Sequence, residues 1–371
     1  MPGTLRARWH AQWSGLRLSS GLRKKMKVLQ IHLNRFRLAH DLLAQYACEN
    51  GLDIVVISEP YEQLPYWYND TVGDASLWVT LFNGRQASSE TLISKKRVVG
   101  IRVENTMCIS GYCSPNMNRQ EFDGYITELE EAIKDGRRRA QALVAGDFNV
   151  KSTAWGGRRT ESRGTYLLDA ITKNELMPIR TTGAYSFARN GKTSIPDILC
   201  VSRRMRQSWE KSAVLDWYSA SDHSYLFHVF LMNRKRQIGG SFNFKYSTRN
   251  ADEGKFLSRF DGYFNFLDND DAKHGDQFQE RLERTCADEL KRILPPRGRR
   301  NCNYWWNDEL SELRRATLRS RRKAQREVAA GRDNGGLVNE FKEATKRLKR
   351  AIERSKDEKW KEFCATLEQD S

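Results

Sequence analysis

Polar side chains follow the ends of several apolar stretches of this sequence. The apolar stretch 142–145 runs directly into Gly146, Asp147, Phe148 and Asn149. Because residues two apart on a strand point to the same side, Asp147 and Asn149 should share one location. Residues in comparable positions are His32, Asn34, Glu59, Tyr112, Ser186, Asp197, Asp222 and His223. Each alone has an ordinary explanation, such as capping a turn, but together they predict a site, since ligands gather where neighbouring strands end.

The types of these residues fit metal-assisted hydrolysis of a phosphodiester bond. Glu59 and Asp222 offer the carboxylate oxygens that Mg²⁺ prefers, alongside water and substrate phosphate. Asp147 can hold the attacking water, with Asn149 beside it. The sequence therefore predicts a metal centre next to an oriented water.

The same reaction needs donors to the phosphoryl oxygens. His223, Asn149 and Tyr112 are the candidates, and Asp197 is the expected carboxylate behind His223, since a histidine that works near neutral pH benefits from such a partner. The sequence contains no G-x-x-x-x-G-K-[ST] loop, no H-E-x-x-H and no G-x-S-x-G. Nucleotide switching, zinc-protease chemistry and acyl transfer therefore lack support.

The positive charge of the chain lies at its two ends. The 371 residues carry a net charge of +16. Residues 1–27 hold seven lysines or arginines and no acid, and residues 291–371 hold 22 against 13 acids. Such flanks suit a polyanion, because each neutralised phosphate releases counterions, although charge alone fits a solvated surface equally well.

The seven cysteines include no C-x-x-C pair, and their number is odd. We interpret them as reduced thiols of an intracellular protein without a zinc site. No apolar run approaches the roughly 18 residues of a membrane span, so no membrane partner is expected.

The segments that carry these side chains alternate between strand and helix patterns over residues 27–232. Apolar residues are spaced as helix faces near 38–46, 122–133 and 165–174, and Gly51 follows the first of these helices. Hairpins mixed with strand–helix–strand units predict the α/β class, with two mixed β-sheets packed face to face and helices outside.

The rest of the chain is expected to consist of extensions. Residues 1–26 are interpreted as a disordered basic extension, 233–300 as a linker with some helix, and 301–371 as a basic α-helical region. Within residues 301–371, Asn307 can cap a helix that has acids in its first turn and arginines later. We expect this tail to form no sizeable core alone, and a chain ending at Met232 to keep the chemistry.

Several motifs, in this order, resemble the endonuclease/exonuclease/phosphatase superfamily: "VISEPY", "SGYCSPN", "VAGDFN", "YSF", "PDILCVS" and "SDH". Within it, "LQIHLNR", "GDFNVKSTAWGG" and "WWNDELSELRR" are similar to the apurinic-type endonuclease domain of non-LTR retrotransposons, especially insect elements. The resemblance spans about Lys27–Met232 and implies a four-layer α/β sandwich. The tail resembles the segment that joins such an endonuclease to a reverse transcriptase.

This resemblance implies that the protein nicks target DNA with Mg²⁺ or Mn²⁺ to start target-primed retrotransposition. By position, Glu59 is the chief metal ligand and Asp222 a second acidic group, while the roles given above for the other residues are unchanged. Ser186 matches a residue that contacts the DNA backbone, and Arg314 and Arg315 of the tail motif are the candidate DNA-binding arginines. The implied partners are target DNA, element RNA at the basic tail and a reverse transcriptase downstream, in the nucleus.

The first strand departs from the family pattern. The family carries an asparagine there that steadies the metal-binding glutamate, and the matching residue here is His32. We expect Asn34, two residues on and on the same strand face, to substitute in part, and His32 to count as a metal-site residue. If His32 contacts Glu59, metal affinity should fall as the pH drops through about 6.5, the ordinary pKa of histidine.

Two alternatives to the retrotransposon endonuclease remain open from the sequence. One is another phosphoesterase of the superfamily, such as an abasic-site repair nuclease or a phosphatase, and the basic tail argues against it. The other is a catalytically impaired nucleic-acid-binding remnant of the element, for which His32 is the main support.

Overall fold

The computed structural model describes residues 24–82, 85–86, 89–103, 105–137, 141–181, 185–189, 191–232, 246–247, 255, 291–292, 303–332 and 335–369. The chain divides into two compact units, one made of Lys25–Met232 and Arg300–Ser371 and the other of Met1–Lys24 and Asn233–Arg299. In the second unit, β17 (Tyr246–Ser247) pairs with β18 (Lys291–Arg292). The expected extension 1–26 and linker 233–300 lie almost entirely outside the described residues.

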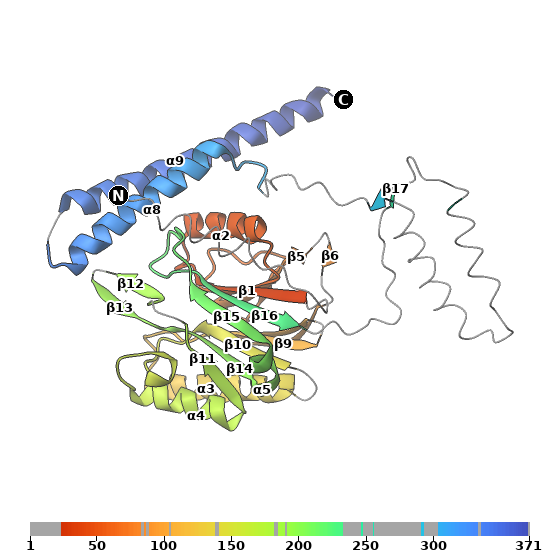
Figure 1. Cartoon of the computed structure of the whole chain (residues 1–371), viewed down its shortest axis with the longest axis vertical. Helices are drawn as coiled ribbons and strands as arrows, with labels where there is room; N and C mark the ends of the chain where they lie inside the picture. Colours follow the sequence, from red (N-terminus) through yellow and green to blue (C-terminus); the bar gives the residue numbers. More distant parts are fainter. Residues whose placement is uncertain are drawn as a thin grey trace. The chain divides into compact units, whose positions relative to one another are not determined.

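Two mixed sheets of six strands form the centre of the first unit (Figure 1). In spatial order, the first consists of β15 (Trp209–Val214), β16 (Leu226–Met232), β1 (Lys24–His32), β2 (Ile54–Ser58), β4 (Ala75–Val79) and β3 (Tyr68–Asn69). The second consists of β11 (Leu176–Ile179), β14 (Asp197–Ser202), β10 (Gln141–Asp147), β9 (Thr106–Tyr112), β8 (Val98–Val103) and β7 (Ser89–Lys95). Strands β1 and β2 run parallel, as do β9 and β10, whereas β14 is antiparallel to β10.

Shorter elements complete this unit at its edges. They are the hairpins β5 (Leu81–Phe82) to β6 (Arg85–Gln86) and β12 (Phe187–Arg189) to β13 (Lys192–Ser194), the 3₁₀ turn η1 (Thr153–Trp155) and the short helix α5 (Arg203–Ser208).

Buried apolar side chains hold the layers together. Val28 and Val56 of the first sheet share one cluster with Leu143 of the second, so the sheets pack face to face. Helix α2 (Arg37–Asn50) covers the outer face of the first sheet, and α3 (Arg119–Arg137) and α4 (Ser162–Lys173) cover that of the second (Figure 1). The predicted four-layer α/β sandwich is confirmed.

Helix α2 ends where its sequence predicts. Gly51 follows its last residue with φ of +54°, and its backbone N–H reaches the carbonyls of Ala47 and Cys48. A residue with a Cβ disfavours this left-handed conformation, so glycine ends the helix at low cost. The strand before α2, in contrast, begins at Lys24, three residues before the expected start of the domain.

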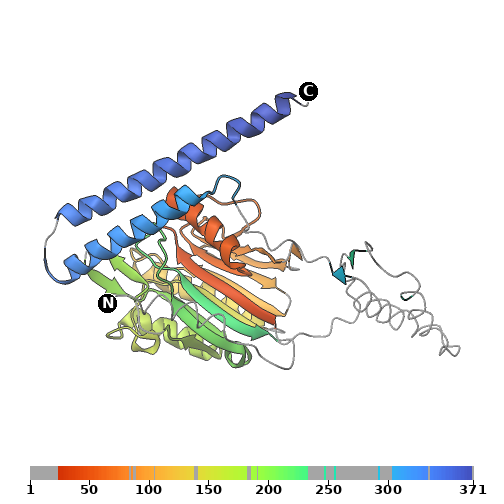
Figure 2. The same ribbon diagram turned by 45° about the horizontal axis from the view of Figure 1, so that its top comes forward.

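The C-terminal region forms two long helices, α8 (Asp308–Ala329) and α9 (Gly335–Gln369), which pack against each other (Figure 2). The side chain of Asn307 accepts a hydrogen bond from the Leu310 N–H at 2.9 Å, which is the predicted N-cap. Helix α9 alone spans 35 residues, so the predicted basic α-helical region is mostly helix where it is described.

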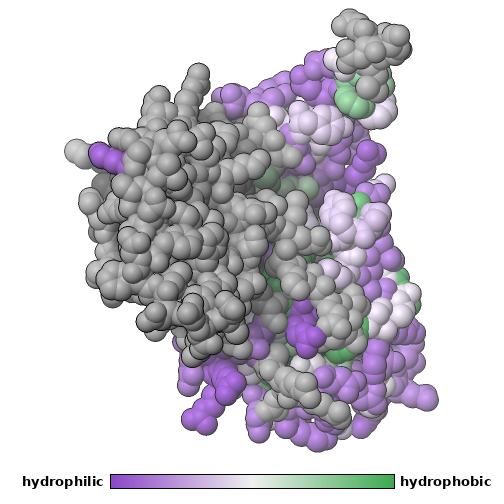
Figure 3. Space-filling view, turned by 90° about the vertical axis from the view of Figure 1, so that its right-hand side faces the viewer, coloured by the Kyte–Doolittle hydropathy of each residue, from purple (hydrophilic) through white to green (hydrophobic). Residues whose placement is uncertain are grey.

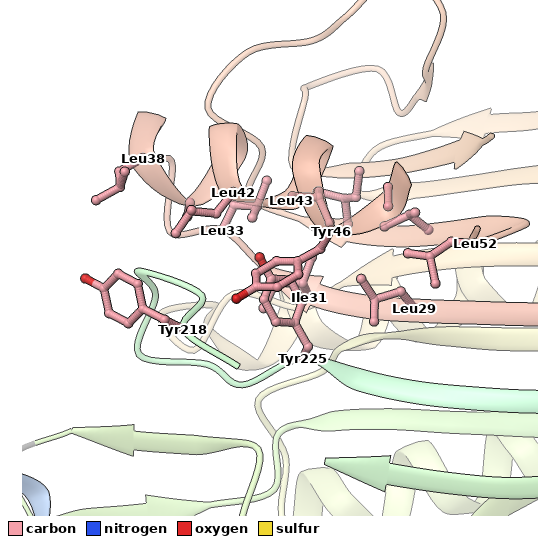
Figure 4. Packing of buried hydrophobic residues seen from close by; sticks show 14 of the residues in the cluster. Leu29, Ile31, Leu33, Leu38, Leu42, Leu43, Tyr46, Leu52, Tyr218 and Tyr225 are labelled. Atoms are coloured by element: carbon pink, nitrogen blue, oxygen red, sulfur yellow. The ribbon is translucent and has the colours of Figure 1, made fainter. Parts of the chain in front are cut away.

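These helices share their core with the sandwich. Trp305, Trp306 and Leu310 belong to the same buried cluster as Leu42 and Tyr46 of α2. Figure 4 shows the α2 side of this cluster, where Leu38, Leu42 and Tyr46 lie above the first sheet near Tyr218 and Tyr225. The tail is therefore more than an appendage, because its apolar residues are buried in one core with α2 and the first sheet.

Arg314 takes part in this packing, which corrects its assignment as a DNA-binding residue. Its guanidinium lies 4.5 Å from the Tyr46 ring centre and 4.8 Å from that of Trp306, and it pairs with Glu49 at 3.1 Å. Only 14% of its side chain is exposed. Arg315 is exposed by 56% and remains a candidate. The sequence motif could not separate the two, since adjacent helix residues face different ways.

One cysteine differs from the expected set of reduced thiols. Cys48 is disulfide-bonded, whereas Cys108, Cys113, Cys200 and Cys364 are free. Spacing along the chain does not reveal which cysteines the fold brings together. Among the described helices, none is both long and apolar enough to cross a membrane.

Candidate active site

The strand-end residues meet at one edge of the two sheets. His32 ends β1 and Glu59 directly follows β2, its neighbour in the first sheet. In the second sheet, Tyr112 ends β9 and Asp147 ends β10, and these two residues are register partners. Asp197 begins the antiparallel β14 and is paired in register with Asp147. The parallel pairs thus bring residues from distant parts of the chain to the same edge.

His32 is the centre of the hydrogen-bonded group. Its Nδ1 lies 2.5 Å from Asp147 Oδ2, and its Nε2 lies 3.0 Å from Glu59 Oε2. The Tyr112 hydroxyl donates to the other oxygen of Glu59 at 2.6 Å. His32 therefore links the proposed metal ligand directly to the proposed water-orienting carboxylate.

His223 lies against His32 and has its own carboxylate. Its Nδ1 is 2.8 Å from Asp197 Oδ2, and its Nε2 is 3.9 Å from Asp147 Oδ2. The two imidazoles stack with ring centres 4.3 Å apart. The predicted His223–Asp197 pair is thus present, and its free nitrogen faces the centre of the group.

Burial and hydrogen bonds shift the titration of this group. Burial disfavours the charged form of His32, but its bonds to Asp147 and Glu59 outweigh this and raise the pKa of His32 to about 10. The bond from His32, opposed by burial and aided by Tyr112, lowers the pKa of Glu59 to about 2. The expected titration of His32 near pH 6.5 is therefore wrong, because two carboxylates bind the imidazolium.

Asp147 and Asn149 are joined by a tight turn. The Asn149 N–H donates to Asp147 Oδ1 at 3.0 Å, and the Asn149 side-chain amide donates to the Cys113 carbonyl at 3.1 Å. Asn149 has φ of +49° and Glu59 has φ of +44°. Backbone strain of this kind is held only where the surroundings over-determine it, and it is common at functional sites.

Gly146 permits the close approach that places Asp147. A Cβ at Gly146 would lie 1.8 Å from the carbonyl oxygen of Gly111 on the neighbouring strand. Any larger residue would separate β9 from β10 and displace Asp147, which is fully buried. This explains the Gly-Asp pair at the end of the strand.

One predicted residue lies differently from expectation, and two others keep untested roles. Strand β1 ends at His32, so Asn34 falls in an exposed turn with φ of +54° and shares no strand face with His32. Ser186 is fully buried, and its contact with a DNA backbone stays a prediction. Asp222 lies at the rim, where 35% of its side chain is exposed and Arg189 is 3.5 Å away.

Two arginines near Glu59 escaped the sequence analysis. Arg35 Nε lies 4.0 Å from Glu59 Oε1, and Arg35 also pairs with Asp74. Arg97 Nε donates to the other oxygen of Asp74 at 2.8 Å. Arg35 directly follows Asn34, but only the left-handed turn at both residues directs it back toward Glu59, and a sequence gives no reliable sign of such a turn.

The donor atoms of this group suit a divalent cation. One ligand atom each from His32, Asp147 and His223 lie within 4.8 Å of one another. Glu59 adds a carboxylate that is 21% exposed and ionised far below neutral pH. The carboxylate oxygens of Asp147 and Glu59 fit Mg²⁺ or Mn²⁺, whereas imidazole nitrogens suit softer ions. His32 would have to give up its proton or its contact with Glu59 when an ion binds.

Comparison with known proteins agrees with this geometry. Residues 106–227 match the model of a family described as endonuclease-reverse transcriptase. The endonuclease domain of TRAS1, a telomere-specific non-LTR retrotransposon, matches 57% of this chain and 100% of its own, with 21% identity and a TM-score of 0.50. A 3′ phosphatase from Neisseria bound to a DNA hairpin covers 55% and 99%, with 14% identity and a TM-score of 0.44. Among curated proteins, none matches this chain.

The family match and the fold agree with each other. Residues 25–232 have the fold of a non-LTR retrotransposon endonuclease domain, and residues 106–227 within them are similar to a family described as endonuclease-reverse transcriptase.

Proposed function

We propose that this protein is a DNA endonuclease that uses Mg²⁺ or Mn²⁺ and nicks target DNA for target-primed retrotransposition. The observation that carries the proposal is the convergence of Glu59, Asp147 and the His223–Asp197 pair on one edge of the sandwich. The similarity of the chain to a retrotransposon endonuclease domain supports DNA as the substrate. Nuclear action, element RNA at the basic tail and a downstream reverse transcriptase belong to the same proposal.

Each group has a distinct task in this reaction. Asp147 orients the attacking water and accepts its proton, and Asn149 and Tyr112 hold the phosphate. His223 donates a hydrogen bond to the phosphoryl oxygens, and Asp197 keeps its ring oriented and offsets its charge. A divalent ion at Glu59, with Asp222 nearby, would polarise the phosphodiester and stabilise the leaving oxygen.

The single test of this proposal is a nicking assay with supercoiled plasmid. We expect relaxed circles in Mg²⁺ and none when EDTA removes the metal. Abasic DNA and a small phosphomonoester serve as competing substrates. Faster hydrolysis of either would favour another phosphoesterase of the superfamily.

We expect His32→Asn to tighten metal binding at neutral pH. In the metal-free protein His32 is protonated up to a pKa of about 10, so an incoming cation must displace a positive charge. Metal affinity should therefore rise with pH, by up to about tenfold per unit for one released proton, until the pKa of His32 is passed. Asparagine removes this dependence.

Calorimetric titration of Mn²⁺ between pH 6 and 9 measures this effect. Equal affinities and equal pH profiles for the two proteins would make His32 a bystander. If the wild-type protein is inactive and His32→Asn nicks DNA, the natural chain is the impaired remnant. His40→Asn, a histidine stacked on Trp67 at 4.8 Å between ring centres, is the matched control.

Arg315, which is exposed on α8, should contribute to DNA binding. Arg315→Ala is expected to lower the slope of log affinity against log salt by about 0.9, the value for one lost phosphate contact. Arg332→Ala is the control, because Glu327 already neutralises that guanidinium through contacts at 2.7 and 2.9 Å. The face in Figure 3 is mainly hydrophilic where it is described. An unchanged slope for Arg315→Ala would mean that its charge is only solvated.

A further inference from the structure

We propose that the α8–α9 hairpin belongs to the catalytic unit, with Arg321 as a positioning residue for the turn that carries Asp222 and His223. This inference rests on the proposed function of those two residues. It concerns the segment between β15 and β16, residues 215–225, which the Leu215 N–H closes by donating to the Tyr225 carbonyl at 2.7 Å.

Both helices of the α8–α9 hairpin form hydrogen bonds with the first residues of this turn. Arg322 binds the Asp216 carboxylate with two nitrogens, of which Nε lies 3.0 Å from Oδ1. In α9, the Thr345 hydroxyl is 3.0 Å from the Tyr218 hydroxyl. Tyr218 is almost completely buried in the cluster that Trp306 also lines. The turn is thus anchored by residues more than 100 positions further along the chain.

Arg321 reaches deeper than its neighbours. It is 9% exposed, and its Nη1 donates to Ser219 Oγ across 3.5 Å. A guanidinium removed from water is costly unless other groups compensate it. Burial lowers the pKa of Arg321, and Tyr218, Asp222 and Asp216 oppose that effect. Its positive charge therefore lies close enough to interact with Asp222, which Arg189 also approaches at 3.5 Å.

Ser219 connects Arg321 to both histidines through hydrogen bonds. Its hydroxyl lies 2.6 Å from the His223 carbonyl and accepts from the Ser221 N–H at 3.3 Å. The Ser221 hydroxyl in turn accepts from the His223 N–H at 3.1 Å and donates to the His32 carbonyl at 2.7 Å. A continuous set of contacts thus leads from Arg321 to the backbones of both histidines.

The backbone of the turn needs such support. Ala220 has φ of +57°, a left-handed conformation that is unfavourable for a residue with a Cβ. Strain of this kind persists only where surrounding contacts over-determine it. Without the hairpin, Ala220 is free to relax and to move the adjacent Ser221–His223 segment.

The experiment compares nicking by the full chain and three variants. Arg321→Ala should lower kcat about tenfold to a hundredfold, because a displacement near 1 Å at a catalytic group costs that much, while KM for DNA changes less than twofold. Arg322→Ala lies on the surface, keeps the fold and should lower kcat in the same direction. Arg326→Ala, exposed on the same helix, is the matched control with unchanged kcat.

A double-mutant cycle separates positioning from general destabilisation. If Arg321 acts through Ser219, Arg321→Ala and Ser219→Ala together should lower kcat no further than the stronger single variant. Additive losses, unchanged kcat in Arg321→Ala and Arg322→Ala, or an equal loss in Arg326→Ala would each overturn the proposal.

Hydrogen exchange keeps the test independent of the proposed function. In Arg321→Ala, amides of residues 219–224 should exchange faster, while those of the central strand β9 stay as in the wild type. If the wild-type protein does not nick DNA but this local loss appears, the endonuclease proposal fails and the anchoring of the turn stands. Unchanged exchange at 219–224 would refute the anchoring itself.

Discussion

Asp147→Asn is expected to slow nicking by a factor of about 10²–10³. Asparagine keeps the size of the side chain and can still accept from the Asn149 N–H, which lies 3.0 Å from Asp147 Oδ1. It cannot accept a proton from water at neutral pH. The rate should therefore fall with little change in KM for DNA, as measured by relaxation of supercoiled plasmid.

The control for this variant is Asp123→Asn, an equal change on the exposed surface of α3, where the rate should not move. Asparagine is preferred to alanine, because Asp147 is fully buried beside a protonated His32. Both substitutions remove the charge that faces His32, a loss that for a buried ion pair costs about 3–5 kcal/mol, but asparagine leaves no cavity in addition. A folded Asp147→Asn protein with the wild-type rate would contradict the assignment.

The second large effect concerns the tail. Trp306→Ala is expected to lower the free energy of unfolding by about 3–5 kcal/mol, the usual range for truncating a buried aromatic residue. Trp306 is 5% exposed, donates to Ser311 Oγ at 2.9 Å and stacks under Arg314. Urea unfolding followed by circular dichroism gives the measurement.

Trp360→Ala provides the matched comparison. Trp360 is 58% exposed near the end of α9, so its truncation should change the stability by less than about 0.5 kcal/mol. Equal effects of the two substitutions would mean that α8 does not pack on the sandwich. That a chain ending at Met232 keeps its chemistry stays a prediction, and the shared core of Trp306 with Leu42 means that such a chain should also be less stable.

The architecture could be predicted from the sequence because it rests on local patterns. Alternating apolar stretches, helical spacing and the stop at Gly51 all depend on neighbours along the chain. The register of β10 against β9 and β14 then brings Tyr112, Asp147 and Asp197 together. A strand-end motif therefore predicted which residues converge.

The burial and the pKa values of those residues could not be predicted in the same way. The contact between His32 and Asp147 joins positions 115 residues apart, and it decides both the burial of the carboxylate and the raised pKa of the imidazole. Arg314 and Asn34 were misplaced for a similar reason, since a packing partner in α2 and the end of a strand settle their directions. Neither the type of a residue nor its spacing along the chain predicts such contacts.

The most direct test of the central claim is the chemistry of the nick itself. Purified full-length protein should convert supercoiled plasmid to open circles in Mg²⁺, and a DNA polymerase should extend the nick without prior treatment, because target priming requires a free 3′ hydroxyl. Asp147→Asn should yield neither product. Open circles that form equally in EDTA, or nicks that the polymerase cannot extend, would contradict a metal-dependent endonuclease that primes retrotransposition.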